Sequence, residues 1–491
     1  MTARYLSKSK VLAGWQCRKR LWLEVHAPEH ARYSAATERA LGIGHEVGEL
    51  ARRLFPGGTL IGHDGELGAA LAQTAAQVAR PGPLTLYEAT FRHEGVLIRA
   101  DVLVRDAAGR VRLVEVKAST GVKPVNHIDC AVQAWVLAGL GLAPERIELG
   151  HIDNRFVYPG GDDYEGLLVF VDLTDKVLTL LDEVPRWLAE DRAVLAGEMP
   201  GIRIGPQCRN PYECAFLPYC TPPQPHYPVS RLPGGGKAVW RLLEEGIDDI
   251  RDVPPGYLGN ERQEWVRRVT VAGQAELRPA AGEALRALPW PRYYFDFETV
   301  AFPVPVWAGT RPYQPLPFQW SCHVESAPGV LEHREFLADG GEAPMRRCAE
   351  TLLEALGDEG PVMVYTNYEA GVLKTLAGMY PDLAPRLEAV AARLFDLHPL
   401  VRANYYHPDM LGSWSIKAVL PTLAPDLSYA ALGEVQEGNA ASDAFQEIMA
   451  PETPAGRRAS LRRDLSRYCA LDTLAMVRLA GALAAGSAVA G

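Results

Sequence analysis

The sequence predicts two mixed α/β domains joined by a small helical connector. The chain has 491 residues, about three to four times the length of an ordinary domain. Proline-rich stretches at 204–234 and 288–292 interrupt two regions in which strand-like and helix-like patterns alternate. We therefore expect domains at 1–225 and 288–491, with the connector at 226–287.

The composition is that of a globular protein. Hydrophobic residues make up 48% and charged residues 22% of the chain, which excludes disorder as the main state. No run of about 18 apolar residues occurs, and the first 20 residues lack the apolar core and cleavage site of a secretory signal. We expect a cytoplasmic protein that does not enter a membrane.

The formal charge of −10 excludes a uniformly basic surface. Basic residues are nevertheless concentrated at the start, where residues 1–60 contain ten Lys or Arg and five Asp or Glu. This bias fits either a solvated helix face or a local contact with a polyanion.

The first domain contains an amphipathic helix, three strands, a second helix and a further strand. Turns at 93–95 and 106–109 predict antiparallel hairpins between the three strands. The expected helices cover 34–54 and 126–140, and the expected strands cover 85–91, 95–104, 110–118 and 147–157.

The strands of this domain carry a candidate catalytic group. Glu115 and Lys117 lie two residues apart on one strand and therefore share a face, and Asp101 comes from the preceding strand. As cross-strand neighbours, Asp101 and Glu115 can share Mg²⁺ or Mn²⁺, which would activate water for phosphodiester hydrolysis beside Lys117. The alternative is an exposed acidic pair with Lys117 as a salt-bridge partner.

The order of these elements resembles the RecB-like branch of the PD-(D/E)XK nucleases, which have a restriction-endonuclease-like fold. The resemblance implies that His45, on the early helix, joins the metal shell and that Gln133, on the later helix, orients the site. Taken alone, His45 fits an ordinary surface or core histidine. The aromatic residue that this family often has four positions after the glutamine is replaced by Leu137.

Four cysteines predict a second centre. Cys208, Cys214 and Cys220 are evenly spaced in a segment rich in proline and aromatic residues, which suits a soft metal centre in a dry loop. The resemblance to iron-sulfur nucleases of the CRISPR-adaptation and AddB type adds Cys17 and implies a 4Fe-4S cluster that joins the ends of the domain. Zinc bound by four cysteines and unligated buried thiols are the alternatives. The remaining cysteines, among them Cys469, are expected in the core.

The second domain begins with an acidic strand. In the segment 293–300, Asp296 and Glu298 share one face of an otherwise apolar strand, so a counter-ion is expected beside them. Near the other end, Tyr468 and Asp472 share a helix face. Further strands are expected at 317–325, 330–337 and 361–366, with helices at 344–356 and 457–485.

Asp-x-Glu on the first strand with Tyr-x-x-x-Asp on the last helix resembles the DEDDy exonucleases, which have an RNase H-like fold. The resemblance implies that four carboxylates hold two divalent ions and that Tyr468 orients the attacking water. We expect Glu369, after a strand and at the start of a helix, to be the remaining carboxylate, with Asp396 as its rival. A solvated acidic pair is the alternative for Asp296 and Glu298.

Together the two resemblances imply a metal-dependent nuclease that hydrolyses DNA, single-stranded or from its ends, with two candidate centres. The alternatives are an exonuclease that acts on RNA and a nucleic-acid-binding scaffold with decayed centres. The expected partner is nucleic acid, DNA rather than RNA. The segment 303–320 is expected to form an ordered loop over the acidic strand, where it could act as a lid.

Overall fold

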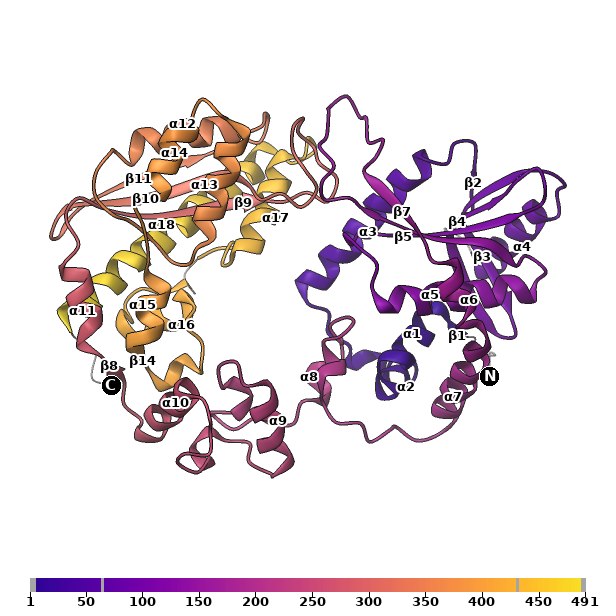
Figure 1. The fold of residues 1–491 in the computed structure, drawn as a ribbon, viewed down its shortest axis with the longest axis horizontal. Coiled ribbons are helices and arrows are strands. Elements are labelled where there is room, and N and C mark those ends of the chain that lie inside the picture. Colours follow the sequence, from indigo (N-terminus) through magenta and orange to yellow (C-terminus); the bar gives the residue numbers. More distant parts are fainter. Residues whose placement is uncertain (1–5, 63–65, 430–431, 487–491) are drawn as a thin grey trace. The chain divides into compact units, whose positions relative to one another are not determined.

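The computed structural model describes residues 6–62, 66–429 and 432–486 and is mixed α/β, which confirms the predicted class. The chain folds into two compact units (Figure 1). Unit 1 comprises Met1–Pro222 with Phe302–Tyr313, and unit 2 comprises Pro223–Ala301 with Gln314–Gly491. Each unit has its own sheet and its own apolar core.

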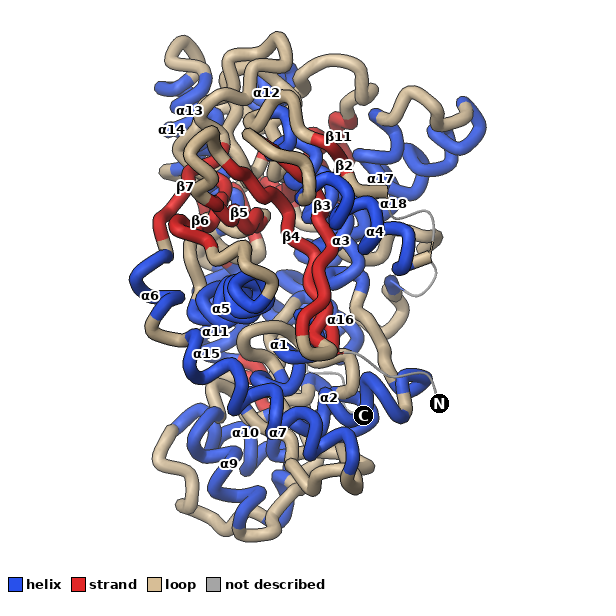
Figure 2. The backbone as a smooth tube through the Cα atoms, turned by 90° about the vertical axis from the view of Figure 1, so that its right-hand side faces the viewer, coloured by secondary structure: helices blue, strands red, loops and turns tan. Residues whose placement is uncertain are grey.

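Unit 1 is built on a seven-stranded mixed sheet with the order β2-β3-β4-β5-β6-β7, and β1 pairs with the start of β4. The antiparallel β3 and β4 form a long hairpin (Figure 2), as their turn sequence predicts. The strands are β1 (Leu6–Ser7), β2 (Thr59–Leu60), β3 (Leu84–His93), β4 (Val96–Arg105), β5 (Val111–Lys117), β6 (Pro144–Ile152) and β7 (Leu168–Asp172).

Helices and short helical turns surround this sheet. Ser7 caps α1 and Ser34 caps α3 through their side-chain oxygens, which satisfies free amides at both helix starts. The α-helices are α1 (Lys8–Gln16), α2 (Arg18–His26), α3 (Ala35–Arg53), α4 (Leu67–Val78), α5 (Pro124–Gly139), α6 (Thr174–Leu178), α7 (Val184–Ala196) and α8 (Leu217–Cys220).

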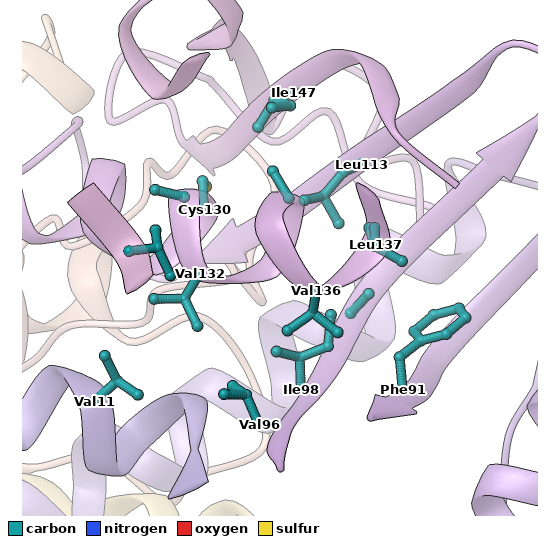
Figure 3. Close-up of a cluster of buried hydrophobic side chains, with 14 of the residues drawn as sticks. Val11, Phe91, Val96, Ile98, Leu113, Cys130, Val132, Val136, Leu137 and Ile147 are labelled. Atoms are coloured by element: carbon teal, nitrogen blue, oxygen red, sulfur yellow. The ribbon is translucent and has the colours of Figure 1, made fainter. Parts of the chain in front are cut away.

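The core of unit 1 lies between α5 and the sheet. Figure 3 shows Val132, Val136 and Leu137 of α5 among apolar side chains that include Ile98 of β4 and Leu113 of β5. All five side chains are at most 1% exposed. Leu137 is therefore a core residue, and this position offers no aromatic group for substrate contact.

The sheet of unit 2 has five strands in the order β11-β10-β9-β12-β13. The first three form an antiparallel meander, and β12 and β13 are parallel to each other and to β9. The strands are β9 (Arg292–Val300), β10 (Leu316–Ala327), β11 (Val330–Leu337), β12 (Val362–Val364) and β13 (Leu394–Asp396), and β14 (Tyr405–Tyr406) pairs separately with β8 (Glu276–Leu277).

Helices cover both faces of this sheet (Figure 1). Trp320 of β10 donates to Thr351 of α12, while Ser321 bonds with Thr473 of α18, so α12 and α18 lie on opposite faces. The α-helices are α9 (Gly236–Glu244), α10 (Glu261–Ala272), α11 (Pro279–Arg286), α12 (Met345–Ala355), α13 (Tyr368–Met379), α14 (Ala384–Ala391), α15 (Leu397–Asn404), α16 (Ile416–Leu423), α17 (Gly438–Met449) and α18 (Ala455–Ala485).

The helix α18 is long and apolar enough to span a membrane by length and composition. Half of its apolar window is buried, and it packs against β9, β10 and β11. These contacts are those of a central core helix, which makes its length weak evidence for a membrane segment.

Two segments differ from their predicted places. Residues 226–287 do not form a separate connector, because Leu242, Trp265 and Leu285 pack in one core cluster with Tyr294 and Met363 of unit 2. The loop Phe302–Tyr313 belongs to unit 1, contrary to the expected lid over the acidic strand. It forms hydrogen bonds there, with Tyr158 N donating to Thr310 O at 2.9 Å and Tyr164 Oη donating to Pro305 O at 3.1 Å.

The strand predicted at 147–157 also lies earlier, at Pro144–Ile152. Its first residue, Pro144, pairs with Val111 of β5. This contact is between residues distant in the sequence, and the periodicity of the sequence does not predict it. It ends before Asp153, whose side chain accepts from Arg155 N at 2.9 Å and forms a turn.

Candidate active sites

The central strand of unit 2 presents two carboxylates to α18, one half-buried (Asp296) and one buried (Glu298). Asp296 and Glu298 alternate with apolar residues on β9, and Glu298 is 5% exposed. Ligand atoms of Asp296, Glu298 and Cys469 lie within 4.8 Å of one another. Asp472, one helical turn after Tyr468, adds a third carboxylate, which is buried. The structure thus brings together the acidic strand and the last helix, as the sequence predicts.

Glu369 completes the cluster from a different element. It lies in the first turn of α13, soon after β12, and is 3% exposed. Its carboxyl group hydrogen-bonds with Asp296, while its Oε2 is buried without a hydrogen-bond partner. An unpartnered buried acceptor is costly and suits a position where a ligand binds.

The rival carboxylate, Asp396, has a structural role. Its Oδ1 accepts from Thr366 N at 3.0 Å and from His398 N at 2.9 Å, so that it caps α15. The Oδ1 atom of Asp396 is therefore already bonded, whereas the Oε2 atom of Glu369 has no hydrogen-bond partner. Of the two candidates, Glu369 is the one that hydrogen-bonds with Asp296.

Burial raises the pKa of all four acids, and repulsion from neighbouring carboxylates adds to the shift of Asp296 and Glu298. Burial, followed by the charges of Asp472 and Glu298, raises the pKa of Asp296 well above its ordinary value. Burial and Asp472 do the same to the pKa of Glu298. Burial also raises the pKa of Asp472 and brings that of Glu369 to about 7. In the absence of a cation, the cluster thus favours bound protons.

Two tyrosines and one lysine border the cluster. Tyr429 Oη donates to Asp472 Oδ1 at 2.5 Å, and the hydroxyl of Tyr468 bonds to the same carboxylate. Lys417 Nζ lies 5.2 Å from the ring centroids of both tyrosines and donates to Gln436 O. Its charge lowers the pKa of Glu298 and Asp472, but one lysine does not balance four carboxylates.

In unit 1, the strand register brings the predicted acids together. Val102 pairs with Val114, which places Asp101 opposite Glu115. Asp101 Oδ2 also accepts from Val116 N at 2.7 Å. Glu115 is 1% exposed, so that the alternative of a solvated acidic pair is wrong for this side chain.

This site contains its own cations. Lys8, at the start of α1, lies 2.9 Å from Glu115 and 3.0 Å from Asp129 of α5. Lys117 pairs with the same two carboxylates, and its distance to Asp129 is 3.0 Å. Gln133 Nε2 donates to Glu115 Oε2 at 2.7 Å and to Asp129 Oδ1 at 3.0 Å. Two lysines therefore face three carboxylates.

The pKa shifts in unit 1 reflect this pairing. Burial, with the charges of Asp101 and Asp129, raises the pKa of Glu115 to about 7 despite the two lysines. Burial alone would raise the pKa of Asp129, but Lys117 and Lys8 outweigh it and lower that pKa. Ion pairing thus keeps Asp129 charged and both lysines protonated.

His45 is not brought into this group. It lies on the exposed side of α3. Within the part of the chain that the structure describes, ligand atoms of His45, Asp101 and Glu115 do not meet within 4.8 Å of one another. The buried positions around Glu115 are occupied by Lys8 and Gln133 instead.

The four predicted cysteines line one small cavity. Cys17 lies between α1 and α2, and Cys208, Cys214 and Cys220 come from the proline-rich segment. Leu23 and Phe216 pack beside them, and Lys19 and Arg20 lie at the same cavity. The structure therefore brings together residues that are 191 positions apart in the sequence. All four are free thiols.

The spacing of these sulfurs can be compared with that of a tetrahedral zinc site. Tetrahedral zinc with bonds of about 2.3 Å places its sulfurs roughly 3.8 Å apart. All four cysteines belong to the described residues, and no three of their sulfurs lie within 4.8 Å of one another. The described sulfurs therefore do not form a preformed tetrahedral zinc site.

Sequence reasoning missed Lys8, Asp129, Tyr429 and Cys469. Lys8 is one of the basic residues concentrated in the first 60 positions, but the sequence does not indicate which carboxylates it pairs with. Asp129 lies four residues before Gln133 in an otherwise apolar helix, a spacing that places both on one face. Nothing in the sequence marks Tyr429.

Comparison with known proteins assigns no activity. A family model described as "Domain of unknown function (DUF2779)" matches residues 293–415, a quarter of the chain. This match includes Asp296, Glu298 and Glu369 but ends before Tyr468 and Asp472. No curated protein matches. One solved structure, "Crystal structure of SSO0001", is similar at 11% identity and a TM-score of 0.21, covering 45% of this chain and 88% of that chain. A TM-score this low supports no structural argument.

The carboxylate cluster of unit 2 predicts that the ion-free protein loses stability as pH rises. The pKa of Glu369 is about 7 in the folded chain against an ordinary value of 4.5, so the folded state binds more protons between these values. Its contribution is complete below the unfolded pKa and is lost as pH rises through 7. Calorimetry in chelator should show a melting temperature several degrees lower at about pH 8 than at about pH 5. Glu369→Gln should reduce the decline, and a melting temperature that rises over this range contradicts the assignment.

The lysine pairs of unit 1 predict a large effect of Lys8→Ala. The substitution leaves buried Glu115 and Asp129 with only Lys117, at a cost of about 3 kcal/mol in unfolding free energy. Urea denaturation of the full chain measures this change. Lys10→Ala is the matched control, because Lys10 lies on the same helix and its amino group has no ion-pair partner among the described residues. Equal midpoints for the two variants would exclude the proposed role of Lys8.

Proposed function

We propose that this protein is a metal-dependent nuclease that hydrolyses phosphodiester bonds of DNA, single-stranded or from its ends. The observation that carries the proposal is the carboxylate cluster of unit 2. Four acids from β9, α13 and α18 converge in a buried site with one nearby lysine. Such a concentration of negative charge requires a cation, and carboxylate oxygens are the preferred ligands of Mg²⁺ and Mn²⁺.

The donor set of unit 2 fits divalent ions. Asp296, Glu298 and Asp472 would hold them, with the free Oε2 of Glu369 as a further ligand. When bound, such ions supply an activated water and stabilise the charge that develops on the phosphate. The Tyr468 hydroxyl, which bonds to Asp472, would orient the attacking water. Lys417 can attract the phosphate to the acidic site.

The order of the elements supports an RNase H-like, DEDDy-type domain in unit 2. Asp296 and Glu298 lie on its first long strand, Glu369 follows a strand and opens a helix, and Tyr468 and Asp472 lie on the last helix. These are the places that the resemblance implies. A 3′ to 5′ direction of cleavage is part of this proposal.

The arrangement of unit 1 supports a restriction-endonuclease-like domain. Its acidic site differs from that of unit 2 because lysine side chains pair with the acids. Asp101, Glu115, Lys117 and Gln133 converge on the hairpin and on α5, as the resemblance to PD-(D/E)XK nucleases implies. Lys8, however, occupies the side of Glu115 where a cation would bind. This observation favours a second candidate role for unit 1, a nucleic-acid-binding module whose own centre does not cut.

The four cysteines of unit 1 are proposed to hold a 4Fe-4S cluster. Their common cavity and apolar neighbours support a cluster, and their described sulfurs do not form a preformed tetrahedral zinc site. By joining Cys17 to the segment after α7, the cluster would fasten α1 and α2, and with them Lys8, to the end of the unit. Its role is structural.

A digestion assay on end-labelled substrates tests the nuclease proposal. With Mn²⁺, the anaerobically purified full chain should shorten single-stranded DNA from its 3′ end, and Asp296→Asn should reduce the rate by at least about 100-fold because the ion loses a ligand. Lys117→Ala should reduce it little if unit 2 carries the cleavage.

The same assay separates the alternatives. Faster degradation of a matched RNA identifies an RNA-directed exonuclease. Binding of either polymer without cleavage by the wild type identifies a scaffold and excludes the proposed activity. Arg347→Ala, which removes an exposed arginine of α12, controls for a general loss of surface charge.

The cysteine assignment predicts a visible chromophore. Protein purified without oxygen should be brown, with broad visible absorbance and about four iron and four sulfide per chain. Cys208→Ala should lose the colour and lower the melting temperature, whereas Cys348→Ala, at a buried thiol of α12, should retain the colour. A colourless wild type with one zinc per chain would contradict the cluster.

A further inference from the structure

The buried thiol of Cys469 lies among the carboxylates of unit 2. Its Sγ is within 4.8 Å of ligand atoms of both Asp296 and Glu298, and its side chain is fully buried. In the described ranges, this is the one group of three His, Cys, Asp or Glu residues that meets at this distance. Sequence patterning assigns Cys469 to the core, but its surroundings are polar on one side.

The geometry of α18 explains this placement. Cys469 lies three residues before Asp472, so both side chains share the buried face of the helix. Thr473, on the same face, bonds to Ser321 of β10, and Ser321 lies opposite Asp296 in the sheet. The buried face of α18 therefore covers the row that contains Asp296, and the thiol approaches the carboxylates from the helix side.

A second observation identifies the cluster as a ligand site. The Oε2 atom of Glu369 is buried without a hydrogen-bond partner, although the same carboxyl group bonds with Asp296. The cluster thus offers an unused oxygen as well as a thiol. The carboxylates of Asp296, Glu298 and Glu369 and the thiol of Cys469 together form a mixed oxygen and sulfur donor set.

Mixed donor sets discriminate between metal ions. Mg²⁺ takes oxygen ligands and does not bind thiolates, whereas Zn²⁺, Co²⁺ and Cd²⁺ bind thiolate and carboxylate together. Coordination of a thiol forms a metal–sulfur bond and releases the thiol proton to solvent, without any change of oxidation state. A thiol at this position therefore favours thiophilic ions.

We propose that Cys469 is a metal ligand that makes the carboxylate centre of unit 2 select thiophilic divalent ions over Mg²⁺. This inference rests on the metal centre of the proposed function and adds the class of ion that the centre prefers. The inference does not depend on which nucleic acid the protein binds or on whether it cleaves one.

Calorimetric titration of the full chain with Cd²⁺ and with Mg²⁺ tests the inference. The four cysteines of unit 1 can also bind Cd²⁺. Binding to the carboxylate centre is therefore defined as the part of the titration signal that Asp296→Asn abolishes. Cys469→Ser should weaken Cd²⁺ binding at this centre at least tenfold and change Mg²⁺ binding less than twofold. Cys348→Ser is the matched control, because Cys348 is an equally buried thiol in the same unit, and it should change neither.

The outcomes are distinct. Unchanged Cd²⁺ binding in Cys469→Ser, or an equal loss for both ions, overturns the role of Cys469 while the metal centre remains. If Asp296→Asn removes no part of the wild-type signal, the centre itself and the proposed function fail together.

A second measurement covers the case in which Cys469→Ser does not fold. The cobalt-loaded wild type should have a thiolate-to-cobalt charge-transfer band in the near ultraviolet that the Asp296→Asn protein lacks. A difference spectrum without this band overturns the proposal. The comparison requires no substitution of Cys469.

Discussion

The concentration of four carboxylates, three of them buried, is the constraint on which the account of unit 2 depends. Asp296 and Glu298 cannot separate, because alternation on β9 fixes them on the same face. Packing of α18 and α13 then adds Asp472 and Glu369. Burial and the charges of Asp472 and Glu369 raise the pKa of both Asp296 and Glu298, and Lys417 offsets only part of the cost. Bound protons or a metal cation would relieve the rest. The fold thus maintains a site whose ionised form is unfavourable without a cation.

Unit 1 relieves a similar constraint with its own side chains. Glu115 and Asp129 are as buried as the acids of unit 2, but Lys8 and Lys117 pair with both of them. The position of Lys8 follows from β1, whose two residues pair with the start of β4 and set the beginning of α1. The two units therefore contain acidic clusters with opposite requirements, and this difference is the reason to assign cleavage to unit 2.

Local patterns in the sequence predict much of this arrangement. Alternation identifies the acidic face of β9, the hairpin places Asp101 opposite Glu115, and helical spacing pairs Tyr468 with Asp472. The missed features depend on long-range contacts. The spacing of the apolar residues in 226–287 does not indicate that they pack against Tyr294. The loop Phe302–Tyr313 belongs to unit 1 through hydrogen bonds to Tyr158 and Tyr164. For the same reason, nothing local distinguishes Cys469 from a core thiol.

Anomalous diffraction from crystals of the full chain grown with Mn²⁺ tests the central claim most directly. The account predicts an anomalous peak in unit 2 in contact with carboxylate oxygens of Asp296 and Glu298, with Glu369 turned toward it. An ordered carboxylate cluster with no peak, or with a lysine side chain moved into its centre, would contradict the account.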